Sequence, residues 1–130
     1  MTEPTLYERM GGAYPIATAA DQLIDHLHTN ATLNNRNRKV RDFHTEQFKA
    51  GYKFMVTGWC IEVSGGPRCY GGRDMIAAQQ SLDLTDYEFD VVAHEIRNTL
   101  YRLDLPRPEI EEFMAIIESY RDNVLSRIAP

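Results

Sequence analysis

Residues 51–75, GYKFMVTGWCIEVSGGPRCYGGRDM, decide the fold of this chain. Apolar side chains recur there at helical spacing, from shortly before the stretch begins: Phe48, Tyr52, Met55, Val56, Trp59 and Val63. A stripe this wide predicts a central core helix in which Trp59 and Phe48 are both buried. The SGGP sequence at 64–67 predicts the end of that helix, because glycine adopts the left-handed backbone of a helix C-terminus and proline cannot continue a helix.

Helical patterns also precede this stretch. Thr5 and Glu8 have the spacing of a capping box, which predicts a short leading helix. Pro15 suits the first turn of a second helix, whose apolar spacing continues toward Asn30. The polar and aperiodic stretch 33–43 predicts a loop, with at most a weak turn of helix.

The sequence after residue 75 continues the same pattern. A short helix is expected over 75–84, and Thr85 and Glu88 then repeat the capping-box spacing at the start of a long helix. A last helix of roughly 18 residues is expected over 110–128. The chain shows neither a strand pattern nor an internal repeat, so the predicted fold class is all-α.

The composition limits the classes of protein to which this chain can belong. The chain has 130 residues, 43% of them hydrophobic and 25% charged, which fits one domain over 1–130. Its apolar runs are too short to cross a bilayer, and its start lacks the features of a secretory signal, so we expect a cytoplasmic protein without a membrane partner. The net charge of −5 argues against nucleic acid as a partner. Cys60 and Cys69 are expected to be reduced.

Three blocks of the sequence carry a family resemblance: LYERMGGAYPIATAADQL, GYKFMVTGWCIEVSGGPRCYGGRDMIAA and FDVVAHEIRNTLYRLDLP. They resemble successive blocks of the group I truncated hemoglobins, over most of the chain. The most specific feature is the pair Gly11-Gly12 combined with GGPRCYGGRDM, in which Gly71 stands where threonine is more usual. The resemblance implies a two-over-two helical sandwich that encloses a heme and binds O2 or NO.

The resemblance also implies where the heme pocket lies. It assigns Met75 to the proximal side of the heme, and Phe89 and Val92 to pocket-facing positions on the next helix. Ile24 stands where many members have a tyrosine that hydrogen-bonds bound O2. Tyr52 and Val56 fall near the distal positions of the central helix, so a hydrogen-bond donor is expected from Tyr52 instead. The proximal histidine of the family corresponds to Gln79.

Glutamine is a poor substitute for that histidine. An imidazole nitrogen is the usual proximal anchor in globins, whereas a carboxamide offers a weakly basic oxygen and no available nitrogen lone pair. Gln79 lies about 65° from the centre of the apolar stripe of its helix, so it can still flank a pocket. It is therefore either a polar residue at a helix edge, or a group that hydrogen-bonds a ligand or coordinates iron weakly.

Other side chains are weaker candidates for an axial ligand. His94 is expected to face water. His44, at the entrance to the central helix, reaches a distal site only if that helix begins early. Lys49 or Lys53 coordinates only after losing a proton in a dry pocket, and Cys69 only as a thiolate. The simpler interpretation is that each of these side chains is a solvated surface group.

Three hypotheses follow from these observations. The first is a globin-fold pocket protein in which heme is absent, weakly held or held by an atypical ligand, with another apolar or tetrapyrrole molecule as an alternative occupant. The second is a heme enzyme of the NO-dioxygenase or peroxidase type with a substitute axial ligand. The third is a heme-free interaction or regulatory module. Whether the protein is an enzyme and its oligomeric state both stay open.

Overall fold

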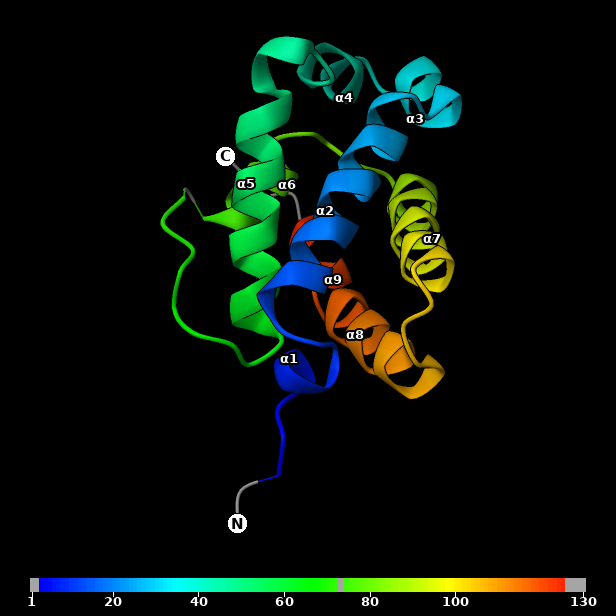
Figure 1. The fold of residues 1–130 in the computed structure, drawn as a ribbon. Coiled ribbons are helices and arrows are strands. Elements are labelled where there is room, and N and C mark those ends of the chain that lie inside the picture. Colours follow the sequence, from blue (N-terminus) through cyan, green and yellow to red (C-terminus); the bar gives the residue numbers. More distant parts are fainter. Residues whose placement is uncertain (1–2, 73, 126–130) are drawn as a thin grey trace.

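The computed structural model describes residues 3–72 and 74–125, and within these residues it contains helices and no strand (Figure 1). The early helices are α1 (Leu6–Arg9), α2 (Ala13–His28), α3 (Ala31–Arg36), α4 (Arg38–Phe43) and α5 (Glu46–Val63). The later helices are α6 (Met75–Gln80), α7 (Asp86–Arg102), α8 (Arg107–Ser119) and α9 (Arg121–Leu125). The all-α prediction is confirmed.

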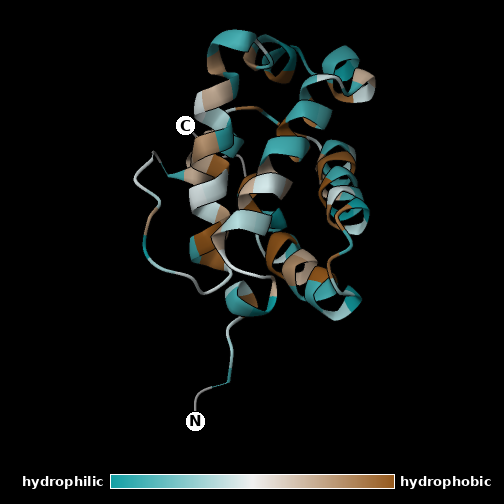
Figure 2. Ribbon diagram, viewed as in Figure 1, coloured by the Kyte–Doolittle hydropathy of each residue, from teal (hydrophilic) through white to brown (hydrophobic). Residues whose placement is uncertain are grey.

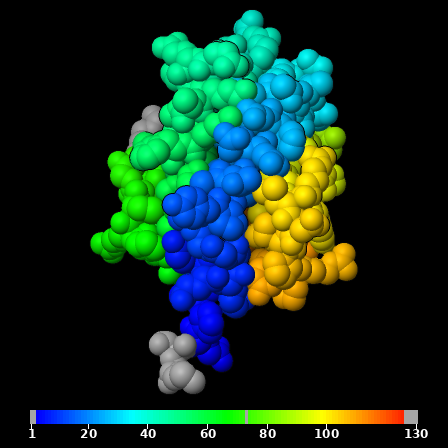
Figure 3. Space-filling view, in the orientation of Figure 1, coloured from blue at the N-terminus to red at the C-terminus, as the bar shows by residue number. Residues whose placement is uncertain are grey.

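Two pairs of long helices form the body of the molecule. Helix α2 packs against α5 in one pair, and α7 packs against both α2 and α8 in the other. Figure 1 shows α2 crossing beside α5, with α7 and α8 on the other side. In the space-filling view of Figure 3, the side chains of α2 form a continuous surface between those of α5 and those of α7 and α8. This arrangement is the expected two-over-two sandwich.

Local sequence signals set several helix ends. Both predicted capping boxes form, Thr5 with Glu8 before α1 and Thr85 with Glu88 before α7. Helix α5 ends as expected, with Gly65 in the left-handed region at φ +98°. A side chain at that position is strained by the backbone and also meets Thr5 at 3.1 Å. The glycine run therefore fixes the point at which the chain leaves the central helix.

The stretch 31–43 differs from the prediction. It forms two short helices instead of a loop, because two asparagines cap them: Asn30 accepts from the amide of Leu33, and Asn37 accepts from the amide of Val40, each at 3.0 Å. Leu33 and Val40 are both buried. One apolar anchor in each helix is too few to give a periodic pattern, and the sequence interpretation therefore missed them.

Two further expectations were wrong. Phe48 is 44% exposed, because it lies in the first turn of α5 and stacks on Phe43 at the surface, with ring centroids 5.5 Å apart. The last helix is divided into α8 and α9 at Tyr120, whose ring packs against Trp59 of α5. Trp59 itself is only partly buried.

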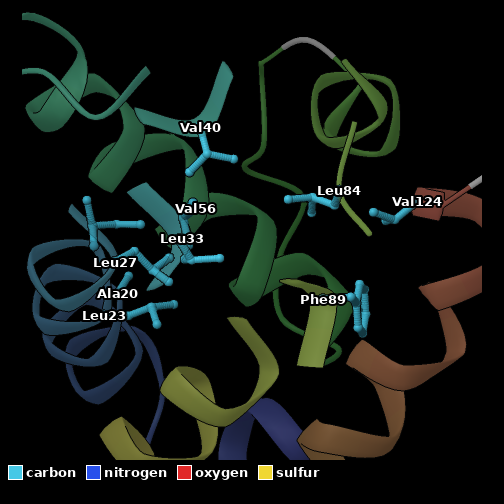
Figure 4. Packing of buried hydrophobic residues seen from close by; sticks show 10 residues of the cluster. Ala20, Leu23, Leu27, Leu33, Val40, Val56, Leu84, Phe89 and Val124 are labelled. Atoms are coloured by element: carbon cyan, nitrogen blue, oxygen red, sulfur yellow. The ribbon is translucent and has the colours of Figure 1, made fainter. Parts of the chain in front are cut away.

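The buried side chains form two clusters that meet along α2, α5 and α7. Figure 2 shows apolar and polar residues alternating along the long helices, as amphipathic helices require. One cluster includes Ile16, Leu100 and Ile110, and lies among α1, α2, α7 and α8. In the other, Leu33, Val40 and Val56 gather on one side, and Leu84, Phe89 and Val124 on the other (Figure 4). Among the described residues, no helix is long and apolar enough to span a membrane.

Candidate functional site

A cavity of about 120 Å³ lies inside the second cluster, where α2 and α5 face α6, α7, α8 and α9. Its walls are almost entirely apolar, and none of the described residues that line it is Asp, Glu, Lys, Arg or His. All seven pocket residues expected from the sequence line this one cavity: Ile24, Tyr52, Val56, Met75, Gln79, Phe89 and Val92. The long helices thus bring together side chains that are up to 68 positions apart in the sequence.

A hydrogen bond crosses from α6 to α5 at one end of the cavity. The amide Nε2 of Gln79 donates to the hydroxyl Oη of Tyr52 at 3.0 Å, and it also lies 3.5 Å from the Sδ of Met75. Asp74 fixes the start of α6 by accepting from the amides of Ile76 and Ala77, at 2.9 and 3.2 Å. That cap fixes the residue at which α6 begins, four positions before Gln79.

Burial controls the chemistry of the tyrosine. It raises the pKa of Tyr52, and the hydrogen bond from Gln79 opposes this effect only in part. Tyr52 is therefore a neutral phenol at physiological pH. Because its oxygen accepts from Gln79, its own proton can still be donated to another acceptor.

A second hollow lies on the other side of this hydrogen bond. This outer groove has a volume of about 570 Å³ and opens between α5 and α6. Its described lining residues are Phe43, Gln47, Phe48, Gly51, Tyr52, Phe54, Met55, Tyr70, Met75, Ala78, Gln79, Ser81 and Leu82. Tyr52, Met75 and Gln79 belong to both hollows, so the hydrogen-bonded pair stands between the inner cavity and the outer groove.

The lysine and cysteine candidates for an axial ligand lie elsewhere. Lys49 binds Asp25, and Lys53 binds both Asp21 and Asp25, each at 2.9 Å on the α2 side of α5. Cys69 is exposed, and its Sγ lies 3.6 Å from the carbonyl oxygen of Gly58. None of the three candidates lines the inner cavity.

His44 is also outside the cavity, in a contact that the sequence did not indicate. Its ring stacks on His28 with centroids 4.5 Å apart, and its Nδ1 lies 2.7 Å from the Oδ1 of Asn34. Burial, and then the neighbouring His28, lower the pKa of His44 to about 4. The Nε2 of His28 is buried and has no hydrogen-bond partner among the described residues. His94 is exposed, as expected.

Several lining residues were not assigned to the pocket from the sequence. Trp59 and Cys60 follow Val56 by three and four positions, so helical spacing was a usable signal for both. Burial raises the pKa of the Cys60 thiol to about 12, which keeps it protonated and unreactive. Leu84 and Val124 reach the cavity from the end of a turn and from α9. No local pattern marked them, because their position depends on how the last helices fold back.

The helical sandwich and the pocket between α5 and α6 define a truncated globin. A family model described as bacterial-like globin matches residues 5–126, and the chain belongs to this family. The group 1 truncated hemoglobin of Tetrahymena pyriformis is 25% identical, over 98% of this chain and 100% of the relative. The corresponding protein of Tetrahymena thermophila is 24% identical, over 96% of this chain and 98% of the relative.

Solved structures agree with this assignment. The Fe(III) form of the Tetrahymena pyriformis truncated hemoglobin superimposes with a TM-score of 0.78 at 23% identity, covering 95% of this chain and 100% of the other. The 2/2 hemoglobin of Synechococcus, solved in the cyanomet state with covalently attached heme, gives a TM-score of 0.77 at 28% identity with the same coverage.

The fold family implies a heme, but the residues at this site do not fit one held in the usual way. Among the described residues, no imidazole lines the cavity, and the expected proximal position carries a carboxamide. The 3.0 Å bond between Gln79 and Tyr52 joins the expected proximal position to an expected distal one, and a flat macrocycle does not fit between the two side chains while they are bonded. The cavity of about 120 Å³ is also smaller than the roughly 300–1,000 Å³ of small-molecule sites.

Proposed function

We propose that this chain is a globin-fold pocket protein that does not anchor a heme through α6. Heme is absent, weakly held or held by an atypical ligand, and the pocket serves a small apolar or tetrapyrrole molecule. The observation that carries the proposal is the hydrogen bond of 3.0 Å from Gln79 to Tyr52. A side chain already engaged across the pocket, and poorly basic, is a weak partner for iron.

The positions of the other candidate ligands also support this proposal. His44 is paired with His28 and Asn34, and Lys53 is paired with two aspartates, so each must lose existing contacts before it reaches the cavity. A persistent apolar cavity argues that the interior is not simply filled by side chains, as an interaction module would require.

The test is the absorbance spectrum of the freshly purified protein, before and after addition of hemin. We expect no strong Soret band at first, and then weak binding without the features of histidine ligation. Gln79→His should gain a histidine-ligated spectrum. Gln80→His is the matched control, because Gln80 is the next residue of α6 but donates to the carbonyl of Asn123 at 2.7 Å, away from the cavity.

Other outcomes select other functions. A native protein with tightly bound heme contradicts the proposal, and single substitutions at His44, Lys49, Lys53, Tyr52 and Cys69 then identify the ligand by loss of the native spectrum. If Gln79→His also fails to bind hemin, the pocket does not open, and the interaction-module hypothesis becomes the better one.

A further inference from the structure

We propose that the Gln79–Tyr52 hydrogen bond is a latch between the inner cavity and the outer groove, and that the opened latch creates one site for an uncharged, flat aromatic molecule. This inference rests on the proposed function, because a tightly held heme would occupy the same space. Beyond the proposed function, it specifies the chemical class of the ligand and the way in which the ligand enters the cavity.

The two hollows are separated only by a few side chains. Tyr52, Met75 and Gln79 line both of them, and all three are in contact through the Gln79 amide. Rotation of the Gln79 side chain away from α5 breaks its bonds to the other two residues. No backbone movement is needed for that step, because glutamine has three rotatable side-chain bonds. The latch is thus a side-chain gate at the base of an open groove.

The residues that line both hollows disfavour a charged ligand. Neither contains Asp, Glu, Lys, Arg or His among its described residues. The closest lysines of α5, Lys49 and Lys53, are held by aspartates on the α2 side. A charged ligand would lose its hydration on entry and meet no opposite charge in return, which is strongly unfavourable in an apolar site. An uncharged ligand is free of that penalty.

Aromatic rings form the wall of the outer groove. Phe43 stacks on Phe48 with an interplanar angle of 8°, and the rings of Phe43 and Tyr52 meet edge to face with centroids 4.9 Å apart. Phe54, which also lines the groove, is 74% exposed. Flat rings offer the stacking and edge contacts that another aromatic molecule prefers. The Tyr52 hydroxyl and Gln79 amide, once released from each other, can hydrogen-bond polar atoms at the edge of that molecule.

The experiment uses two dyes that differ by a single sulfonate. N-phenyl-1-naphthylamine is uncharged, and 8-anilino-1-naphthalenesulfonate carries the same rings with a negative charge. Fluorescence titration of the native protein should give at least 10-fold tighter binding of the uncharged dye. Ala78→Phe, which fills the groove, should weaken that binding at least 10-fold. Ala77→Phe is the matched control, because Ala77 is exposed on the same helix outside both hollows.

Stopped-flow mixing tests the latch itself. Tyr52→Phe removes the hydroxyl and keeps the ring, and it should speed entry of the uncharged dye about 3- to 10-fold, the range expected for loss of one hydrogen bond. Gln79→Leu removes the other partner and should act in the same direction. Circular dichroism melts establish whether each variant is folded. If Tyr52→Phe does not fold, Gln79→Leu still tests the latch.

Each other outcome overturns a specific claim. Equal binding of the two dyes rejects the uncharged ligand class. Equal effects of Ala78→Phe and Ala77→Phe would show that the dye does not bind in the outer groove. Unchanged entry rates in both folded latch variants would show that the Gln79–Tyr52 hydrogen bond does not control entry. A native Soret band of tightly bound heme overturns the proposed function together with the latch. A heme-free protein that ignores the uncharged dye overturns the latch alone.

Discussion

The two ends of this molecule are packed differently. Around α1 and α8, Ile110 is fully buried. Arg9 of α1 forms a bidentate ion pair with Glu112 of α8, and both hydrogen bonds are 2.8 Å long. The apolar hollow among α2, α7 and α8 is about 30 Å³, and a separate hollow of about 410 Å³, lined in part by charged side chains, lies along α7, α8 and α9. Around α5 and α6 the hollows are about 120 and 570 Å³, and α6 has no fully buried residue. We therefore expect stability to be concentrated at the first end, whereas the second end has room for a ligand.

The largest expected effect tests this difference in packing. Ile110→Ala should lower the free energy of unfolding by about 3–5 kcal/mol, because it leaves a hole in a well-packed region that cannot easily collapse. Ile76→Ala on α6 should lower it by only about 1 kcal/mol, since Ile76 is partly exposed and already borders a cavity. Urea unfolding of both variants measures the contrast. Equal losses would show that the two ends are packed alike.

A buried polar cluster supports the cavity end. The carboxylate of Glu88 accepts from the side chain of Asn37 and the amide of Thr85, each at 3.0 Å, and lies 3.5 Å from the Nε of Arg36. Glu88→Ala should lower stability by about 1–3 kcal/mol, because it leaves one N–H of the buried Asn37 side chain without its acceptor and removes the capping box of α7. Glu8→Ala removes the exposed capping box of α1 and should lower it by less than about 1 kcal/mol. A similar loss in both variants would mean that burial of Glu88 adds nothing.

The paired histidines give the cavity end a dependence on pH. Burial lowers the pKa of both His28 and His44, the latter to about 4, with Lys49, Lys53, Asp25 and Glu46 also acting on His28. Both rings are therefore harder to protonate in the folded protein, and the unfolded chain binds more protons as the pH falls from 6.5 toward 4. Stability is fully present above pH 6.5 and should fall by about 1–2 kcal/mol toward pH 4, after allowance for partial exposure.

Thermal melts across this pH window measure the effect. His44→Phe keeps an aromatic ring against His28 and cannot take up a proton, so it should reduce the slope. His94→Gln changes an exposed histidine outside this pair and should leave the slope unchanged. If the slope of stability against pH changes in His94→Gln and not in His44→Phe, the titrating group is a surface histidine and not the buried pair.

The smallest expected effect is on the latch. Tyr52→Phe should lower the free energy of unfolding by only about 0.5–1 kcal/mol, the net contribution of one hydrogen bond, even though it changes ligand entry. Tyr14→Phe, at a surface position, should have no measurable effect. A loss above about 2 kcal/mol at Tyr52 would mean that the pair holds the structure together, and is not free to open.

Much of the fold could be predicted because its signals are local. Thr5, Glu8, Thr85 and Glu88 specify two helix starts through contacts within four residues. The long apolar stripes specify which faces are buried, although Phe48 shows that a stripe can extend past the core into the first exposed turn. The helices over 31–43 were missed because each has one buried anchor, and an asparagine cap alone is a weak signal.

The sequence by itself determined the helical class, the resemblance to truncated globins, seven of the residues that line the cavity and the glutamine at the expected proximal position. Only the tertiary structure decided what that glutamine contacts, because Tyr52 is 27 residues away and the direction of each side chain depends on how α5 and α6 pack. The same holds for the stacking of His28 on His44, and for the ion pairs that hold Lys49 and Lys53 away from the cavity. Helix periodicity fixes which face a residue occupies, whereas contacts between helices depend on packing that no local pattern encodes.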